Sequence, residues 1–155
     1  MKTVTFCGHR DVFPNEEVRH LLNDAIEAEI QIGAEQFLVG GRGEFDSMAA
    51  AAVRVAKKRH RDKKIQLYPV EPYMREGIKR DRAYYESLYD GIITPQELLG
   101  VHPKAAIIMR NRWMIQKADC LIAFVQRDFG GAYQTLNYAM KKGIRIANLA
   151  DNRQT

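Results

Sequence analysis

The chain has 155 residues and a mass of 17.8 kDa, with 46% hydrophobic and 28% charged residues, values that fit one globular domain with a core of its own. Its net charge of +5 and pI of about 9.3 favour anionic partners. No apolar run approaches the roughly 20 residues that span a bilayer, and the first residues enter a strand-like segment without a signal-peptide pattern. We therefore expect a cytoplasmic protein with no membrane partner.

The two cysteines, Cys7 and Cys120, both lie in strand-like apolar segments. Neither has a C-x-x-C partner or the spacing of a metal-ligand pair. We expect two reduced packing residues, and we expect neither a metal nor a resident cofactor.

The first half of the chain alternates strand and helix patterns. Residues 4–7 are a short β-rich run, and apolar side chains then recur at helical spacing from Pro14 to Ile32. Pro14 suits the first turn of that helix, and Gly33 stops it. Residues 37–39 predict the second strand, and the alanine-rich segment 47–58 predicts the helix that follows it.

The second half continues the alternation after an irregular stretch. Residues 65–70 predict the third strand, and residues 71–100 mix turns with helical pieces around 79–88. The remaining elements follow in order: a helix at 104–117, a strand at 120–125, a helix at 131–142 stopped by Gly143, and a strand at 144–149. In the 104–117 helix we expect five inward positions: Ala105, Ile108, Met109, Trp113 and Ile115.

A basic run at residues 57–64 carries much of the positive charge. It lies at the end of a predicted helix, where cations complement the helix dipole and stay solvated. A nucleic-acid patch is the alternative, but no aromatic side chains are interleaved with these charges.

Alternating strands and helices predict parallel pairing through right-handed crossovers. We expect one α/β domain over residues 1–155, a Rossmann-like, doubly wound three-layer sandwich with a mainly parallel five-stranded sheet in the order 3-2-1-4-5. In such a sheet, ligands bind at the carboxyl ends of the strands beside the point where the winding reverses. The loops after strands one, two and four should therefore surround one cleft.

These three loops have unusual compositions. Glycines at strand-to-helix junctions allow close approach of a ligand, and free amides at a helix start suit a phosphate. The predicted phosphate- or ligand-binding residues are Gly8, His9 and Arg10 in the first loop, Gly40, Gly41, Arg42 and Gly43 in the second, and Gly130, Gly131, Gln134 and Thr135 in the third.

Individual side chains in the loops have more than one possible role. Arg10 and Arg42 suit bidentate bonds to phosphate, and Gln134 and Thr135 offer neutral donors. His9 could donate to phosphate or ribose, or it could make a structural hydrogen bond within the turn.

The candidate catalytic residues are two carboxylates and two arginines. Asp46 could cap the following helix or act as a catalytic acid, whereas Glu44 is the freer carboxylate and could hold a ribose hydroxyl or act as a base. Arg110 and Arg112 flank Asn111 on the helix entering the fourth strand. They either form a solvated helix face or face the cleft as anion ligands.

Three segments together resemble a known family. Residues 5–10, Thr-Phe-Cys-Gly-His-Arg, resemble the strand-one signature of the YpsA-like proteins, a domain-of-unknown-function family of the SLOG superfamily. Residues 40–50 are similar to its second glycine motif. Residues 110–114, 118–122 and 130–139 resemble its last third, so the resemblance spans nearly the whole chain.

The resemblance implies a Rossmannoid domain that binds nucleotides or nucleotide-derived signals, often as an oligomer, so we expect a homo-oligomer. The superfamily also holds the DprA/Smf Rossmann domain and the LOG (lysine-decarboxylase-like) phosphoribohydrolases, whose motif pairs an arginine with Pro-Gly-Gly-x-Gly-Thr-x-Glu. Arg110 or Arg112 matches that arginine, and Gly130-Gly131 matches the glycines. However, Phe129 replaces the proline, and no carboxylate stands near Leu136 or Asn137, where the glutamate belongs.

Three functions therefore remain, in descending order of expectation. The first is a binding or sensor module for a nucleotide-type small molecule, without turnover. The second is a nucleoside-monophosphate phosphoribohydrolase or related N-glycosidic enzyme, with Glu44 substituting for the missing glutamate. The third, a single-stranded nucleic-acid binder, is expected least.

Overall fold

The computed structural model describes residues 1–13 and 15–151. The elements, in chain order, are β1 (Lys2–Gly8), α1 (Glu16–Gln31), β2 (Ala34–Val39), α2 (Gly43–Arg59), β3 (Gln66–Pro69), α3 (Glu76–Arg80), α4 (Arg82–Leu88), the 3-10 helix η1 (Gln96–Leu98), α5 (Pro103–Lys117), β4 (Cys120–Phe124), α6 (Gly131–Lys142) and β5 (Arg145–Asn148). The five strands form one parallel sheet in the order β3-β2-β1-β4-β5. The predicted strand order and Rossmann-like architecture are confirmed.

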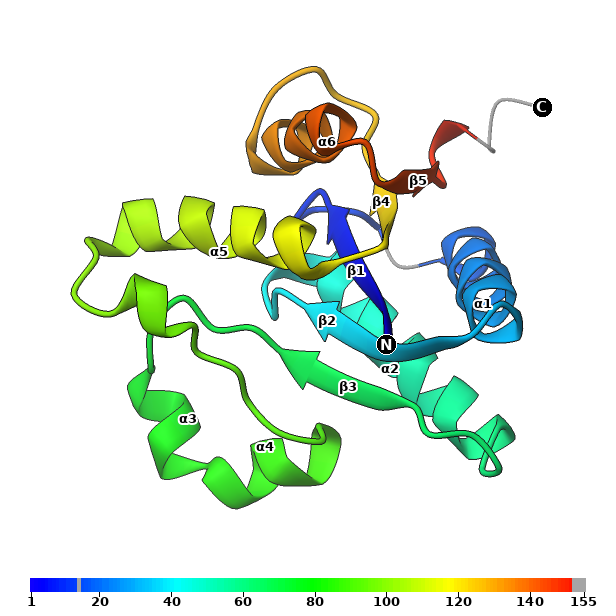
Figure 1. Cartoon of the computed structure of the whole chain (residues 1–155), viewed down its shortest axis with the longest axis horizontal. Helices are drawn as coiled ribbons and strands as arrows, with labels where there is room; N and C mark the ends of the chain where they lie inside the picture. Colours follow the sequence, from blue (N-terminus) through cyan, green and yellow to red (C-terminus); the bar gives the residue numbers. More distant parts are fainter. Residues whose placement is uncertain (14, 152–155) are drawn as a thin grey trace.

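Alternate residues of the central strands face two different helix layers. Val4 and Phe6 of β1 pack with α1 and α2, whereas Cys7 packs with residues of α5 and α6. The alternation follows from the two-residue period of a strand. Helices therefore cover both faces of the sheet (Figure 1), which explains why β4 is apolar and buried at every position.

The structure defines how the first two helices begin. The side chain of Asn15 caps α1 by accepting from the amide of Val18 at 2.9 Å; the prediction that Pro14 opens this helix falls outside the described residues. Helix α2 begins at Gly43, four residues before the predicted start, with Arg42 as its N-cap residue. Asp46 is therefore not the N-cap, and the predicted capping role is wrong.

The buried face of α5 was also predicted wrongly in part. Ala105, Ile108 and Met109 are exposed, Trp113 is half-buried, and Ile115 is buried. Ala106, Arg110 and Met114 instead form the inward row at four-residue spacing, with Ile115 beside it. The rule that apolar residues face inward fails here because a buried arginine belongs to that row.

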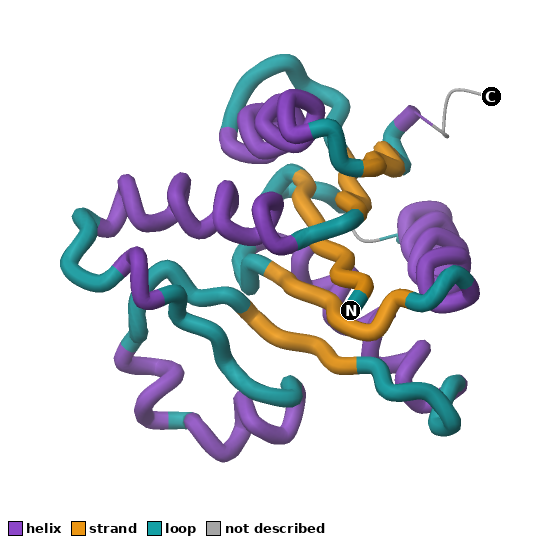
Figure 2. The backbone as a smooth tube through the Cα atoms, in the orientation of Figure 1, coloured by secondary structure: helices purple, strands orange, loops and turns teal. Residues whose placement is uncertain are grey.

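The 71–100 segment folds back along the edge strand β3. The helical pieces predicted around 79–88 are two short helices, α3 and α4, which lie beyond β3 (Figure 1). The chain then returns beside β3, where the amides of Asp90 and Ile93 donate to the carbonyls of Leu67 and Pro69 at 2.9 and 3.0 Å. Figure 2 shows this return as a long loop between α4 and η1.

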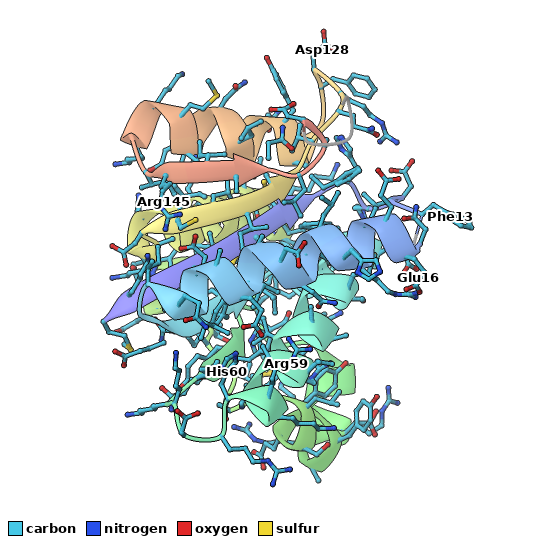
Figure 3. The ribbon with its side chains drawn as sticks, turned by 90° about the vertical axis from the view of Figure 1, so that its right-hand side faces the viewer. Phe13, Glu16, Arg59, His60, Asp128 and Arg145 are labelled. Carbon is cyan, nitrogen blue, oxygen red and sulfur yellow. The ribbon has the colours of Figure 1, made fainter. Side chains whose placement is uncertain are left out.

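The basic run extends from the last turn of α2, as predicted. Lys57 pairs with Asp90, and both Arg59 and His60 contact Glu27 of α1 at 2.7 Å. Figure 3 shows Arg59 and His60 at the C-terminal end of α2. Residues 61–64 of the run are exposed.

Candidate functional site

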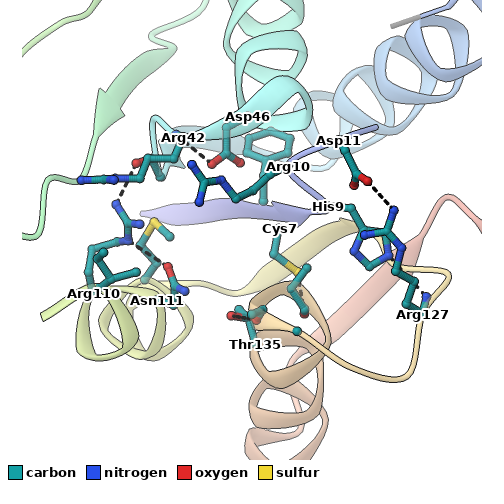
Figure 4. Close-up of a pocket in the computed structure, with 18 of the residues that line it drawn as sticks. Cys7, His9, Arg10, Asp11, Arg42, Asp46, Arg110, Asn111, Arg127 and Thr135 are labelled. Atoms are coloured by element: carbon teal, nitrogen blue, oxygen red, sulfur yellow. Dashed lines mark hydrogen bonds and ion pairs between the residues drawn. The ribbon is translucent and has the colours of Figure 1, made fainter. Parts of the chain in front are cut away.

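A cleft of about 510 Å³ opens at the carboxyl ends of β1, β2 and β4. Eight predicted ligand-binding residues line it: Gly8, His9, Arg10, Gly40, Arg42, Gly130, Gly131 and Thr135. Asp46 and Arg110, two of the four candidate catalytic residues, also line it (Figure 4). Gly41, Gly43, Gln134, Glu44 and Arg112 are not among its lining residues. The three loops therefore meet at one site.

The first and second loops pack directly on one another. The amide of Glu44 donates to the carbonyl of Arg10 at 3.1 Å. Gly43 has φ +87°, and a Cβ there would lie 2.8 Å from the Cα of Arg10. Only glycine permits this combination of conformation and close approach. Gly43 therefore allows the second loop to pack against the backbone of Arg10 in the first loop.

His9 joins the first loop to the third. Its Nε2 accepts hydrogen bonds from the amides of Gln126 at 2.9 Å and Arg127 at 3.3 Å. An acceptor at Nε2 places the proton of the neutral ring on Nδ1. Burial and the nearby Arg127 lower the pKa of His9, although Asp11 opposes the shift. Of the two predicted roles of His9, these hydrogen bonds are the structural one, within the turns.

Arg110 ties together the ends of two strands. It is 3% exposed, and its Nη1 donates to the carbonyls of Gly40 at 2.7 Å and Val70 at 2.8 Å. Its Nε donates to Asn111 Oδ1 at 2.8 Å. The prediction that these arginines form a solvated helix face is therefore wrong for Arg110. Arg112 is exposed, and its guanidinium lies over the ring of Tyr138.

Arg42 is held at the edge of the cleft by Tyr73. Its Nη2 donates to the Tyr73 hydroxyl at 3.0 Å, and its guanidinium lies over the Tyr73 ring. Nearby, a Cβ on Gly41, which has φ +75°, would lie 3.3 Å from Glu71 Oε1. Gly41 thus shapes the second loop against the buried carboxylate of Glu71.

The third loop presents a helix N-terminus to the cleft. Gly130, the N-cap residue of α6, has φ +92° and ψ 177°, a region that only glycine adopts readily. The first bond of the helix runs from the Gln134 amide to the Gly130 carbonyl, so the amides of residues 131–133 have no intrahelical acceptor. The Thr135 hydroxyl donates to the Gly131 carbonyl at 2.9 Å. Free amides and the positive end of the helix dipole thus border the cleft.

The charges around the cleft are mostly positive. Arg10, Arg42, Arg110 and Arg127 line it, with Asp11 and Asp46 as the acidic groups. Asp11 is neutralised by Arg127, whose Nη2 lies 2.7 Å from its Oδ2. The Arg10 side chain is exposed and makes no ion pair or hydrogen bond with the described residues. Its guanidinium is available to a ligand.

Asp46 is the second acidic group of the cleft, and its side chain is half-buried. Burial raises the pKa of Asp46 to about 7, against the opposing effects of the Arg42 amide and of Arg110. Its Oδ2 accepts from the Arg42 amide at 3.3 Å. A carboxyl group that titrates near neutral pH can exchange a proton with a bound molecule.

Comparisons with solved structures identify the fold. The chain superposes on TM1055 over 99% of its own length and 80% of that chain (TM-score 0.63, 15% identity). It matches DNA processing protein A (DprA) of Streptococcus pneumoniae over 94% of its own length and 49% of that chain (TM-score 0.64, 16% identity). It matches DprA of Helicobacter pylori over 97% of its own length and 70% of that chain (TM-score 0.63, 15% identity). It also matches the Moco carrier protein of Chlamydomonas rheinhardtii over 96% of its length and 76% of that chain (0.54, 15%).

The chain therefore shares its fold with these proteins. The relationship to DprA that the sequence motifs imply is confirmed at the level of the fold alone. No family model and no curated protein sequence matches the chain.

Both cysteines are free and buried, as predicted. Burial, with a contribution from Asp46, raises the pKa of Cys7, and burial likewise raises that of Cys120 to about 11. Low thiolate content makes both thiols poor nucleophiles. Within residues 1–13 and 15–151, no group of three acidic, histidine or cysteine side chains is placed to hold a metal, and no helix is long and apolar enough to cross a bilayer.

Several lining residues of the cleft are absent from the predicted site residues. Asp11, Asn111, Arg127 and Phe129 all border it. Phe129 directly precedes the Gly130-Gly131 pair and Arg127 lies three residues before Gly130, so their position in the chain is a usable signal. Three tyrosines of the 71–100 segment, Tyr84, Tyr85 and Tyr89, do not line the cleft. Tyr84 and Tyr85 form an edge contact with each other, and Arg54 lies over the Tyr89 ring.

Proposed function

We propose that the cleft is a binding or sensor site for a nucleotide or nucleotide derivative, held chiefly through its phosphate. The observation that carries the proposal is that the unpartnered guanidinium of Arg10 and the free amides at the start of α6 border the same cleft. Both are donors without acceptors, and together they form a site for a negatively charged oxygen cluster.

Size and chemistry support a nucleotide over a bare anion. A cleft of about 510 Å³ falls within the range of small-molecule sites. Part of its lining is apolar, including Phe6, Ile107 and Met114. The Moco carrier protein and H. pylori DprA, the latter a binder of single-stranded DNA, have a similar fold, and ligands of a related kind are what we propose here.

Replacing Arg10 by alanine should weaken the affinity for adenosine monophosphate (AMP) or ADP-ribose about tenfold, since a charged hydrogen-bond donor contributes about 1.5–3 kcal/mol. The measurement is isothermal titration calorimetry with each nucleotide in turn. Arg10 is exposed, so folding should be unaffected.

The matched control is Arg61→Ala, which removes an exposed arginine from the basic run beyond α2. It should leave both affinities unchanged. Equal losses in the two variants would show that binding follows net charge and not the cleft. Absence of binding by the wild-type protein across purine and pyrimidine nucleotides would refute the proposal itself.

Asp46 supports a second candidate function, hydrolysis of an N-glycosidic bond in a nucleoside monophosphate. Its pKa of about 7 is suited to general acid–base catalysis. Glu44, the other carboxylate that we considered, is exposed and outside the cleft lining. Release of free adenine from AMP by the wild-type protein, lost in Asp46→Asn and retained in Glu44→Gln, would favour this function over simple binding.

Asp46 also predicts a pH dependence of binding. The anionic form that prevails above pH 7 repels a bound phosphate, so the affinity for ADP-ribose should fall severalfold between pH 6.5 and 8.5. ADP-ribose is the suitable probe because a phosphomonoester gains charge itself near pH 6. Asp46→Asn should bind with the low-pH affinity throughout; a wild-type affinity that is flat, or that rises with pH, would contradict this role.

A further inference from the structure

The loop between β4 and α6 carries an aromatic ring at the cleft. Residues 126–130 are all exposed, and Phe129 is 65% exposed while it lines the cleft. Figure 3 shows neighbouring Asp128 at the outer end of this loop. Exposing so much of an apolar ring to water is unfavourable, which raises the question of what the ring contacts when the site is filled.

Hydrogen bonds and an ion pair anchor the base of this loop. His9 accepts from the amides of Gln126 and Arg127, and Arg127 pairs with Asp11. Phe129 has no ring or cation–π partner among the described residues. The loop therefore holds a free aromatic face beside a firmly anchored turn.

Other aromatic side chains do not share this position. Phe6 also lines the cleft but is 1% exposed and stacks on Phe37 within the core. Phe13, the most exposed phenylalanine among the described residues, is not part of the cleft lining. Of the described residues, Phe129 alone is both an exposed aromatic and a lining residue of the cleft.

We infer that Phe129 is a specificity residue that stacks on the base of the bound nucleotide. This inference rests on the proposed function. Phe129 directly precedes the N-cap Gly130 and the amides at the start of α6, so the phosphate and the planar ring of one ligand would be recognised by adjoining parts of one loop. The site then selects phosphorylated compounds that carry a planar ring over sugar phosphates that lack one.

Stacking also predicts the pattern of selectivity. Every base has a π-face, so stacking on an aromatic side chain tolerates different bases. The cleft should therefore distinguish AMP from ribose 5-phosphate much more strongly than it distinguishes AMP from GMP.

The test compares Phe129→Ala and Phe129→Trp with the wild-type protein, with titrations of AMP and of ribose 5-phosphate. Loss of a stacked ring should weaken AMP binding about tenfold or more in Phe129→Ala, while Phe129→Trp keeps the wild-type affinity within about twofold. Ribose 5-phosphate should bind all three proteins equally. Phe13→Ala, which removes an exposed ring outside the cleft, is the control and should change neither affinity.

The outcomes separate this inference from the proposed function. Unchanged AMP affinity in Phe129→Ala, or equal losses for AMP and ribose 5-phosphate, would overturn the stacking role while leaving the phosphate site in place. A wild-type protein that binds ribose 5-phosphate as tightly as AMP would overturn it as well. A wild-type protein that binds neither compound would refute the proposed function and the stacking role together.

Discussion

Substituting alanine for Gly8 should destabilise the protein by about 3 kcal/mol, the upper end of the usual cost of overpacking a core. An added Cβ would lie 2.4 Å from ring carbons of Phe45, which is completely buried and packs against Phe124. Neither the strand nor the ring can move without disturbing the core. Chemical denaturation of the two proteins measures the difference.

Two further variants make the Gly8 experiment specific. Gly77→Ala places a Cβ in α3 with nothing within 4 Å, so it should be neutral or slightly stabilising. Phe45→Leu removes the ring that Gly8→Ala strikes, so the double variant should lose less stability than the sum of the two single losses. Strictly additive losses would show that the contact is not the cause.

Arg110→Met should cost about 3 kcal/mol or more, since breaking a buried charged network leaves its partners unpaired. The carbonyls of Gly40 and Val70 would lose their donor. Asp46 would also lose the charge that holds its pKa down to about 7, so the pKa of Asp46 should rise further. Denaturation at pH 7 and an NMR titration of the Asp46 carboxyl group measure the two effects.

Arg112→Met is the matched control for this experiment, because Arg112 lies two residues away on the same helix and is exposed. Its cost should stay below about 0.5 kcal/mol, as for most surface substitutions. Similar losses in the two variants would mean that Arg110 is not the clamp between β2 and the end of β3.

The architecture and the location of the cleft were predictable because they rest on local signals. Strand patterns alternate with helix patterns, and glycines follow β1, β2 and β4. Right-handed crossovers between parallel strands allow only a few strand orders. In these orders the loops at the carboxyl ends of the central strands lie beside one another. These local signals alone predict that Gly8, Gly40 and Gly131 lie around one site.

The features that the sequence did not predict depend on contacts between distant segments. The burial of Arg110 depends on carbonyls 70 and 40 residues away in the chain. The role of His9 in the loop depends on amides 117 and 118 residues away. The sequence pattern predicts a start of α2 four residues too late and so makes Asp46 a helix cap; a sequence pattern carries least information at the ends of elements.

Amide NMR tests most directly whether the loops holding Gly8, Gly40 and Gly131 bind a phosphorylated nucleotide, as we propose. In a titration of the ¹⁵N-labelled protein with ADP-ribose, we predict saturable shifts of the amides at residues 8–11, 40–42 and 130–133, with the largest at the start of α6. Shifts confined to the basic run at 57–64, or no shifts at millimolar ligand, would contradict the proposal.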